Sequence, residues 1–210
     1  MLESLNDTPR LRRSMKSINT FFRNHKIENM EIPFDVKCDS FSLEMEKLEM
    51  HIQDLIKNYL ANPIDETLVS IFNHIQFWGG TMGRMYYIHN KNNRLINEHL
   101  VIYKEIISCM IAAKNDTLCG DIDKIIIEFE KVRGIGISFG TKHLRFWSIS
   151  ANKNGVEFPI LDSVIAINRF TPNYLKWSNY CQYVMLMQKE ALKRKITVTD
   201  LERQYFNEIN

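Results

Sequence analysis

The stretch RGIGISFGTKHLRFW (133–147) combines residue types that could bind a phosphate group and present an amine beside it. Three of the eight glycines, Gly134, Gly136 and Gly140, fall within seven positions, so we expect the backbone to bend and to allow close approach. Backbone amides that such a turn exposes at the start of a helix suit a phosphate. Lys142 follows at the mouth of an apolar, aromatic-rich run. The stretch therefore predicts a phosphate-binding turn with a lysine next to it.

The flanking residues predict two helices around this turn. The first helix is expected over 121–132 (DIDKIIIEFEKV), before the turn, and the second over 141–150 (TKHLRFWSIS), after it. This order is typical of a helix-hairpin-helix motif, which holds the backbone of DNA, and we place the motif at about 121–150. A P-loop is excluded because Thr141 separates Gly140 from the lysine and no strand clearly precedes the glycines. The glycine spacing and the helical flanks exclude a dinucleotide-binding fingerprint.

A second stretch, FPILDSVIA (158–166), is expected to return to this lysine. Pro159 blocks a helix, and Asp162 occupies the expected N-cap position of the next one. The intervening helix carries the chain away by about 1.5 Å per residue, and a loop of about ten residues is long enough to bring it back. Asp162 can therefore lie beside Lys142.

In these two stretches the sequence resembles a known family. GISFGTKHLRFW followed by PILDSVIA is similar to the bacterial 8-oxoguanine DNA glycosylase-like proteins, a divergent branch of the helix-hairpin-helix DNA glycosylase superfamily. The resemblance is specific over 129–167, and WGGTMGR (78–84) and YLKWSNYCQYVMLMQKEA (174–191) are compatible with the same branch. The chain departs from the usual hairpin, L-P-G-V-G-x-K, because Ser138 replaces a hairpin glycine when Gly140 is aligned as the second one.

The resemblance implies a DNA glycosylase with AP-lyase activity that excises an oxidised or modified purine such as 8-oxoguanine. Lys142 would be the nucleophile and Asp162 the aspartate that assists it. The enzyme would flip the base out of double-stranded DNA, and the lysine amine would form a Schiff base with C1′ of the sugar. The residues expected to contact DNA are Gly136, Gly140, Thr141, His143 and Arg84.

Each of these residues also has an ordinary structural interpretation. A lysine after a glycine turn is usually a solvated residue at a helix start, and an aspartate after a proline is usually only an N-cap. His143 is otherwise a helix-surface histidine, and the loop around Arg84 is otherwise a plain turn. The alternative function is a catalytically degenerate module on the same fold that binds nucleic acid or a protein partner, including a role in defence against foreign DNA.

Composition limits the class of protein. The chain has 210 residues, enough for a well-filled core, and its 27 basic and 25 acidic residues give a net charge of +2. DNA would therefore be held by a local patch or by backbone amides rather than by a global field. The four cysteines lie far apart with no histidine at zinc-ligand spacing, so we expect no metal and no cofactor.

The expected cellular location depends on two signals that the sequence does not show, a membrane span and a signal peptide. No apolar stretch approaches the roughly 20 residues that span a bilayer, so we expect no contact with a membrane. The first residues, MLESLNDTPRLRR, lack the apolar core of a signal peptide. We therefore expect a cytoplasmic protein whose cysteines are free thiols.

Helix is the element that must position these residues. Apolar residues recur at helical spacing, first from Leu11 to Phe22 and again from Leu48 to Tyr59, and KIIIEF has β-propensity only within a helical context. We expect an all-α, compact bundle of about nine or ten short helices in a single domain over 1–210. The remaining helices are expected over roughly 66–77, 94–114, 121–132, 141–150, 163–169, 174–194 and 199–208.

Overall fold

The computed structural model describes residues 41–79, 94–132, 135–151, 155–161, 163–170 and 176–209. All regular elements in these ranges are helical, which confirms the predicted all-α class. None of these helices is both long and apolar enough to cross a membrane. Contacts divide the chain into two compact units, Met1–Leu48 and Glu49–Asn210. The predicted stripe over 11–22 lies outside the described residues, and a single domain over 1–210 stays a prediction.

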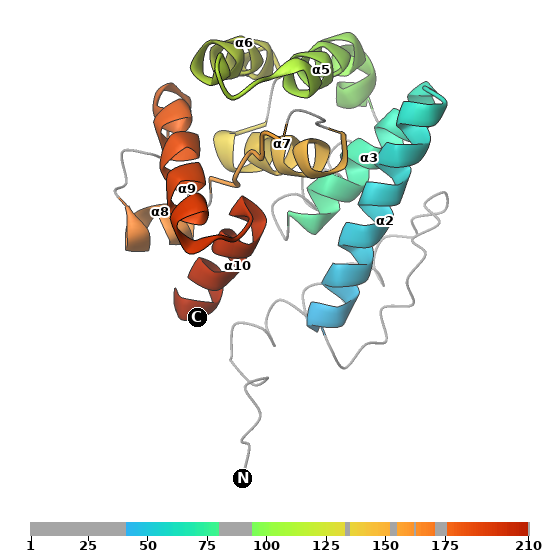
Figure 1. Ribbon diagram of the computed structural model, residues 1–210. Helices are drawn as coiled ribbons and strands as arrows, with labels where there is room; N and C mark the ends of the chain where they lie inside the picture. The colour runs from blue at the N-terminus through green and yellow to red at the C-terminus, as the bar shows by residue number, and fades with distance from the viewer. Residues whose placement is uncertain are drawn as a thin grey trace. The chain divides into compact units, whose positions relative to one another are not determined.

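The helix boundaries follow the breaks that the sequence predicts. Pro63 precedes α3, and Asn115 and Asp116 separate α5 from α6. The β-prone KIIIEF lies inside α6, where helical spacing buries one face of apolar side chains. The elements are α2 (Phe41–Ala61), α3 (Asp65–Trp78), α5 (Arg94–Ala112), α6 (Leu118–Glu130), α7 (Ile137–Ala151), α8 (Ser163–Arg169), the 3-10 helix η2 (Trp177–Asn179), α9 (Tyr180–Arg194) and α10 (Val198–Ile209) (Figure 1).

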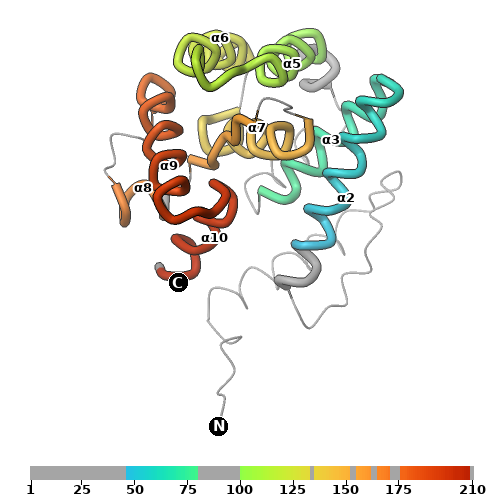
Figure 2. Tube along the Cα trace, viewed as in Figure 1, coloured from blue at the N-terminus to red at the C-terminus, as the bar shows by residue number. Residues whose placement is uncertain are grey.

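The helix α7 is central to the unit formed by Glu49–Asn210. Both α3 and α5 pack against it, and Figure 2 shows it in the middle of the trace, below α5 and α6 in this view. All nine residues from 140 to 148 are buried. Buried polar groups need partners within the protein, so the partners of these side chains determine what α7 can do. The polar ones are Thr141, Lys142, His143, Arg145 and Ser148.

A disulfide links the first turns of α6 and α9. Cys119 pairs with Cys181, 62 positions later, with their Cα atoms 5.4 Å apart. The prediction of free thiols is therefore wrong for these two cysteines, because the packing of α6 against α9 brings together residues whose spacing gives no hint of it. Cys109 on α5 is a free thiol, and Cys38 lies outside the described residues.

We expect reduction of the Cys119–Cys181 disulfide to destabilise the protein. A cross-link that closes a loop of about 60 residues contributes about 4 kcal/mol through the entropy of the unfolded chain. That free energy corresponds to a melting temperature lower by roughly 10 °C. Thermal unfolding with and without a phosphine reductant measures the shift. The variant Cys119→Ser/Cys181→Ser should melt like the reduced protein in both conditions. Thiol titration of the denatured, unreduced wild type is a second test, and the pairing would be contradicted if every cysteine reacted as a thiol.

Candidate functional site

Lys142 lies within α7 and not directly after a hairpin. The helix begins at Ile137, and the Gly140 amide donates to the Gly136 carbonyl at 2.9 Å. Gly140 is thus a helical residue whose amide is already paired, so the predicted helix start at 141 is wrong, and the contact of Gly140 with DNA stays a prediction. Residues 131–136 join α6 to α7, and two of them lie outside the described residues. The helix-hairpin-helix motif stays a prediction, and Gly136 is exposed just before α7.

Gly140 instead allows an aromatic ring to approach α7 closely. A Cβ at this position would lie only 2.7 Å from Cζ2 of Trp177. The Trp177 indole also stacks on Phe129 of α6, with ring centroids 5.5 Å apart. A glycine inside a helix costs about 1 kcal/mol relative to alanine, and this contact explains why the smaller residue fits best here.

We expect Gly140→Ala to destabilise the protein by roughly 1–3 kcal/mol, because the added methyl group meets a stacked ring that cannot easily move. Gly120, in the first turn of α6, is the matched control, since a Cβ there meets nothing within 4 Å. Gly120→Ala should be neutral or stabilising by up to about 1 kcal/mol. Urea unfolding of both variants measures the difference, and equal effects would contradict this role for Gly140.

The amine of Lys142 is held between its own helix and the end of α3. Its Nζ donates to Ser138 Oγ at 3.1 Å and lies 4.5 Å from the centre of the Phe139 ring. Phe139 in turn rests against Gly79, where a Cβ would come within 2.4 Å of the ring. Only 8% of Lys142 is exposed, so it is not the solvated lysine of the ordinary interpretation. Ser138 and Lys142 are four residues apart, and this spacing indicates that their side chains are neighbours on one face of a helix.

The return segment, defined as residues 155–161, runs back along α7 towards Lys142. The Phe158 amide donates to Ser148 Oγ at 3.2 Å, and the Leu161 amide donates to Thr141 Oγ1 at 3.0 Å. The two acceptors on α7 are about seven helical residues apart, and the two donors are about three residues apart. Seven residues of helix and three residues of extended chain both span roughly 10 Å, so the segment is extended and runs antiparallel to α7 between these two bonds. It ends beside the helical turn that carries the lysine.

Side chains of α9 and α10 fix the return segment in this position. The hydroxyl of Tyr180 donates to the Pro159 carbonyl at 2.7 Å, and that of Tyr183 donates to the Ile160 carbonyl at 3.2 Å. The Ile160 amide donates to the carboxylate of Glu202. The buried backbone groups of the segment are therefore satisfied by specific side chains, which gives the segment one defined path.

Thr141 connects the return segment to the first turns of α7. Its hydroxyl donates to the Ser138 carbonyl at 3.2 Å and accepts from the Leu161 amide. The side chain is fully buried, and its contact with DNA stays a prediction. Asp162 follows Leu161 in the sequence and lies outside the described residues, as does Arg84. The next helix, α8, begins at Ser163, in agreement with the predicted boundary.

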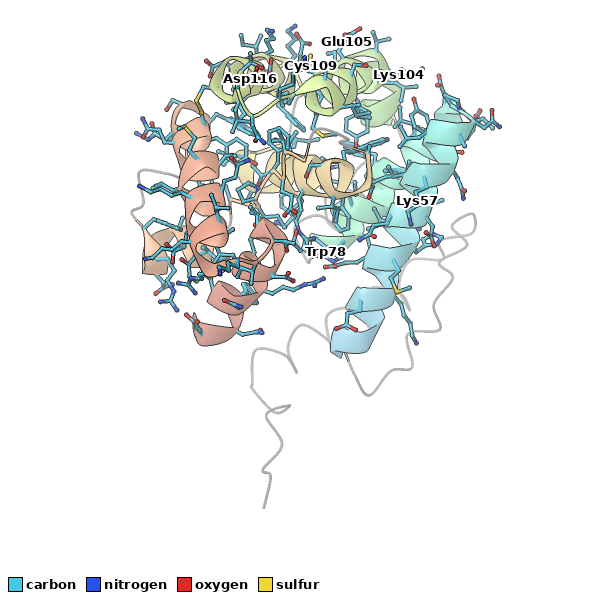
Figure 3. The ribbon with its side chains drawn as sticks, in the orientation of Figure 1. Lys57, Trp78, Lys104, Glu105, Cys109 and Asp116 are labelled. Carbon is cyan, nitrogen blue, oxygen red and sulfur yellow. A yellow bond between two sulfur atoms is a disulfide. The ribbon has the colours of Figure 1, made fainter. Side chains whose placement is uncertain are left out.

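Arg145 forms a buried ion cluster one helical turn beyond Lys142. Its guanidinium lies 3.6 Å from a carboxylate oxygen of Glu49 and 3.3 Å from one of Glu202. Its Cζ also lies 5.5 Å from the ring centre of Trp78, which Figure 3 labels at the end of α3. Two carboxylates offset this positive charge, so Arg145 holds α7 in the core and is not a cation open to a phosphate. Sequence reasoning missed this cluster because its carboxylates come from distant helices.

His143 belongs to a buried chain of hydrogen bonds. The Trp147 indole N–H donates to the Tyr103 hydroxyl at 2.9 Å, and that hydroxyl lies 2.7 Å from His143 Nδ1. Gln76 Nε2 lies 3.0 Å from His143 Nε2 and donates to it, which leaves the ring proton on Nδ1. Nδ1 then donates to the Tyr103 hydroxyl, whose oxygen accepts from both His143 and Trp147. With 1% exposure, His143 is not the helix-surface histidine of the ordinary interpretation, and its contact with DNA stays a prediction.

Burial, with a smaller contribution from the positive charge of Lys142, lowers the pKa of His143 from 6.5 to about 3. The unfolded chain therefore binds a proton below pH 6.5 that the folded protein binds only near pH 3. The contribution of neutral His143 to the free energy of unfolding is therefore fully present above pH 6.5. It falls as the pH drops from 6.5 towards 3, by at most about 1.4 kcal/mol per pH unit.

We expect His143→Gln to flatten this part of the pH dependence. Urea unfolding at about pH 7 and about pH 5 compares the slopes of the variant and the wild type. NMR titration of the imidazole tests the same point without a mutation, because a neutral ring at about pH 5 is the expected result. A ring that titrates at the ordinary histidine value would contradict its burial as the neutral form.

The described residues contain no group of three or more His, Cys, Asp or Glu side chains that could hold a metal ion. An open cavity of about 760 Å³ lies beside α9, but Lys142 and Thr141 do not line it. The lysine, the return segment and the end of α3 are therefore the candidate site. No family model matches the chain, and the curated proteins and solved structures compared with it show no match either.

Proposed function

We propose that the protein is a DNA glycosylase with AP-lyase activity that acts on an oxidised or modified purine in double-stranded DNA. Lys142 is the nucleophile and Asp162 the assisting carboxylate. The observation that carries the proposal is the hydrogen bond between the Leu161 amide and Thr141 Oγ1. This bond joins the residue before Asp162 to the residue before Lys142. Two residue types that the chemistry needs thus come from segments that are bonded to each other.

The reaction proceeds through a covalent bond between Lys142 Nζ and C1′ of the sugar. The base leaves with the electron pair of the glycosidic bond, and the Asp162 carboxylate stabilises the positive charge that develops at C1′. The neutral amine donates its lone pair to C1′ and loses a proton. Opening of the bond between C1′ and the ring oxygen gives the Schiff base. Loss of a proton from C2′ then expels the 3′ phosphate and cleaves the strand.

The surroundings of Lys142 suit this role. Little water reaches the amine, because only 8% of Lys142 is exposed. The bond to Ser138 Oγ restricts the side chain to one direction. The Phe139 ring lies 4.5 Å from the amine nitrogen and limits its movement on that side. These contacts restrict the orientation of an amine whose neighbour in the sequence, Thr141, is bonded to the return segment.

Borohydride trapping tests the proposal. The protein is incubated with a duplex that carries 8-oxoguanine, and separately with an abasic duplex, in the presence of sodium borohydride, which reduces a Schiff base to a stable amine. The expected result is one covalent protein–DNA adduct that survives denaturing electrophoresis. A protein that shifts the duplex in a native gel, but never becomes linked to it or releases a base, would be the catalytically degenerate binding module instead.

A further inference from the structure

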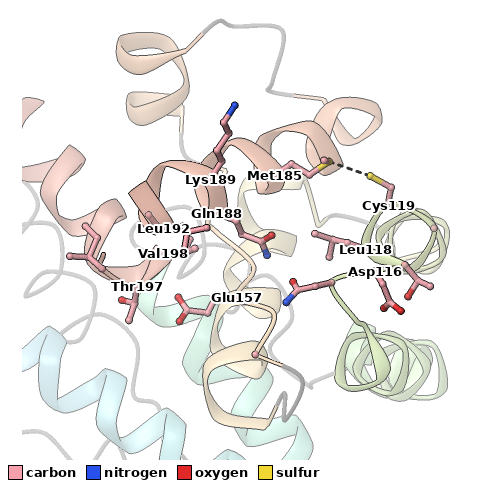
Figure 4. Close-up of a pocket in the computed structure, with 16 residues that line it drawn as sticks. Asp116, Leu118, Cys119, Glu157, Met185, Gln188, Lys189, Leu192, Thr197 and Val198 are labelled. Atoms are coloured by element: carbon pink, nitrogen blue, oxygen red, sulfur yellow. Dashed lines mark hydrogen bonds between the residues drawn. The ribbon is translucent and has the colours of Figure 1, made fainter. Parts of the chain in front are cut away.

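Three sulfur atoms from two helices gather at the edge of the cavity beside α9. Cys119 lies in the first turn of α6, and Cys181 and Met185 lie one helical turn apart on α9. Cys119 Sγ is bonded to Cys181 and lies 3.7 Å from Met185 Sδ, the pair joined by a dashed line in Figure 4. A disulfide sulfur carries no hydrogen, so in the oxidised protein this is a contact between sulfur atoms. We call these three residues the sulfur cluster.

Solvent has access to the sulfur cluster. Cys119 is exposed, 54% of Met185 is exposed, and both line the open cavity. Cys181 is buried on the helix side of the cluster. A small reductant or a metal ion can therefore reach the cluster from the cavity without unfolding of α6 or α9.

Both cysteines of the sulfur cluster lie at helix N-termini, which offsets part of the cost of reduction. Cys119 and Cys181 each lie in the first turn of a helix, of 13 and 15 residues respectively. The partial positive charge at a helix N-terminus stabilises a thiolate, and stabilisation of the reduced form makes a disulfide easier to reduce. Two equivalents of a small-molecule thiol convert the pair to two cysteine thiols and leave as their own disulfide. The reduced cluster then offers two cysteine thiols, which bind a metal ion as thiolates, and one thioether.

We propose that the reduced sulfur cluster binds one soft, monovalent metal ion of the copper(I) type. Thiolate and thioether sulfur are the ligands that select copper(I). With metal–sulfur bonds of about 2.3 Å, three ligands in a trigonal plane lie about 4 Å apart. Cys119 Sγ and Met185 Sδ are already 3.7 Å apart, and the Cα separation of 5.4 Å lets the two cysteine sulfurs move apart by side-chain rotation. Binding releases two thiol protons and leaves one net negative charge.

Zinc fits the sulfur cluster poorly. It takes four ligands in a tetrahedron, usually thiolate, imidazole or carboxylate. Among the described residues no further His, Cys, Asp or Glu joins the two cysteines to complete such a set. The thioether of Met185 is therefore the ligand that favours the proposed ion over zinc. This inference concerns residues other than Lys142 and Asp162, so it stands or fails independently of the glycosylase proposal.

Copper(I) titration tests the inference in a background of Cys38→Ser and Cys109→Ser, which leaves only the cluster cysteines. The protein is reduced, freed of reductant and titrated without oxygen against a coloured copper(I) chelator. We expect one equivalent of copper(I) to be retained by the reduced protein and none by the disulfide form. Met185→Leu should weaken binding roughly tenfold or more, because one of three ligands is lost. X-ray absorption should show only sulfur neighbours.

The matched control is Met50→Leu, which replaces another exposed methionine, on α2, and should leave copper(I) affinity unchanged. Melting curves verify that each variant is folded. Copper(I) affinity that is the same in Met185→Leu and in its parent would overturn the inference. So would retention of copper(I) by the variant Cys119→Ser/Cys181→Ser, or zinc binding that matches copper(I) in strength and depends equally on Met185.

Discussion

Replacement of Lys142 by glutamine is expected to abolish both the borohydride-stabilised adduct and strand cleavage while the protein stays folded. Glutamine keeps a long polar side chain that can still bond to Ser138, but its amide has no nucleophilic amine. The covalent step then has no alternative route, so we expect single-turnover cleavage to fall by a factor on the order of a thousand or more. Gel quantification with enzyme in excess over an 8-oxoguanine duplex measures this rate.

Lys57→Gln provides the matched control for this loss. Lys57 lies on α2, its side chain is 62% exposed, and its ion pair with Asp54 is of a kind that contributes little stability (Figure 3). Its replacement should leave both adduct and cleavage at wild-type levels. Abasic sites can trap incidental amines, so the comparison is made on the base lesion at equal occupancy of the DNA. An adduct that forms at the wild-type rate with Lys142→Gln would remove Lys142 from the chemistry.

The helices could be predicted because their signals are local. Apolar spacing and breaks at Pro63 and at Asn115 predicted α3, α5 and the start of α6 to within a few residues, and α8 was predicted over 163–169 as observed. The proximity of the return segment to Lys142 could also be predicted. That prediction needed only the rise of a helix and the reach of an extended loop, and the bond from Leu161 to Thr141 agrees with it.

Most failures of prediction concern contacts between residues far apart in the sequence. Gly140 was interpreted as a hairpin residue because the ring of Trp177, which makes a glycine necessary inside α7, comes much later in the chain. The sequence predicts a DNA contact or a place on the helix surface for His143, and its buried partners Gln76 and Tyr103 could not be foreseen because they lie on other helices. Cys119 and Cys181 were assigned as free thiols for the same reason. A single sequence carries no periodic signal for such contacts.

Asp162→Asn is expected to lower the single-turnover rate of base excision by a factor on the order of a hundred or more, while DNA affinity stays within a few-fold. A carboxylate stabilises the charge that develops at C1′, and a neutral amide of the same shape does so far less. The effect lies in the transition state and not in binding. Stability should change little, because asparagine is about as good an N-cap as aspartate before α8.

An abasic duplex separates the two possible roles of Asp162, because this substrate has no base to lose. If the carboxylate assists departure of the base, the defect of Asp162→Asn should be larger on 8-oxoguanine DNA than on abasic DNA. Thr141→Val provides a second test, since it removes the acceptor of the Leu161 amide and leaves the aspartate in place. We expect it to slow excision as well, whereas Thr141→Ser, which keeps the hydroxyl, should not.

The opposite outcome has an equally definite meaning. Wild-type excision by Asp162→Asn, together with wild-type excision by Thr141→Val, would make Asp162 an N-cap and the return segment a structural connection only. Loss of excision in Asp162→Asn alone would keep the carboxylate in the reaction, but it would show that the Leu161 bond does not position it. Loss in both variants, with retention in Thr141→Ser, is the result that the geometry of the return segment predicts.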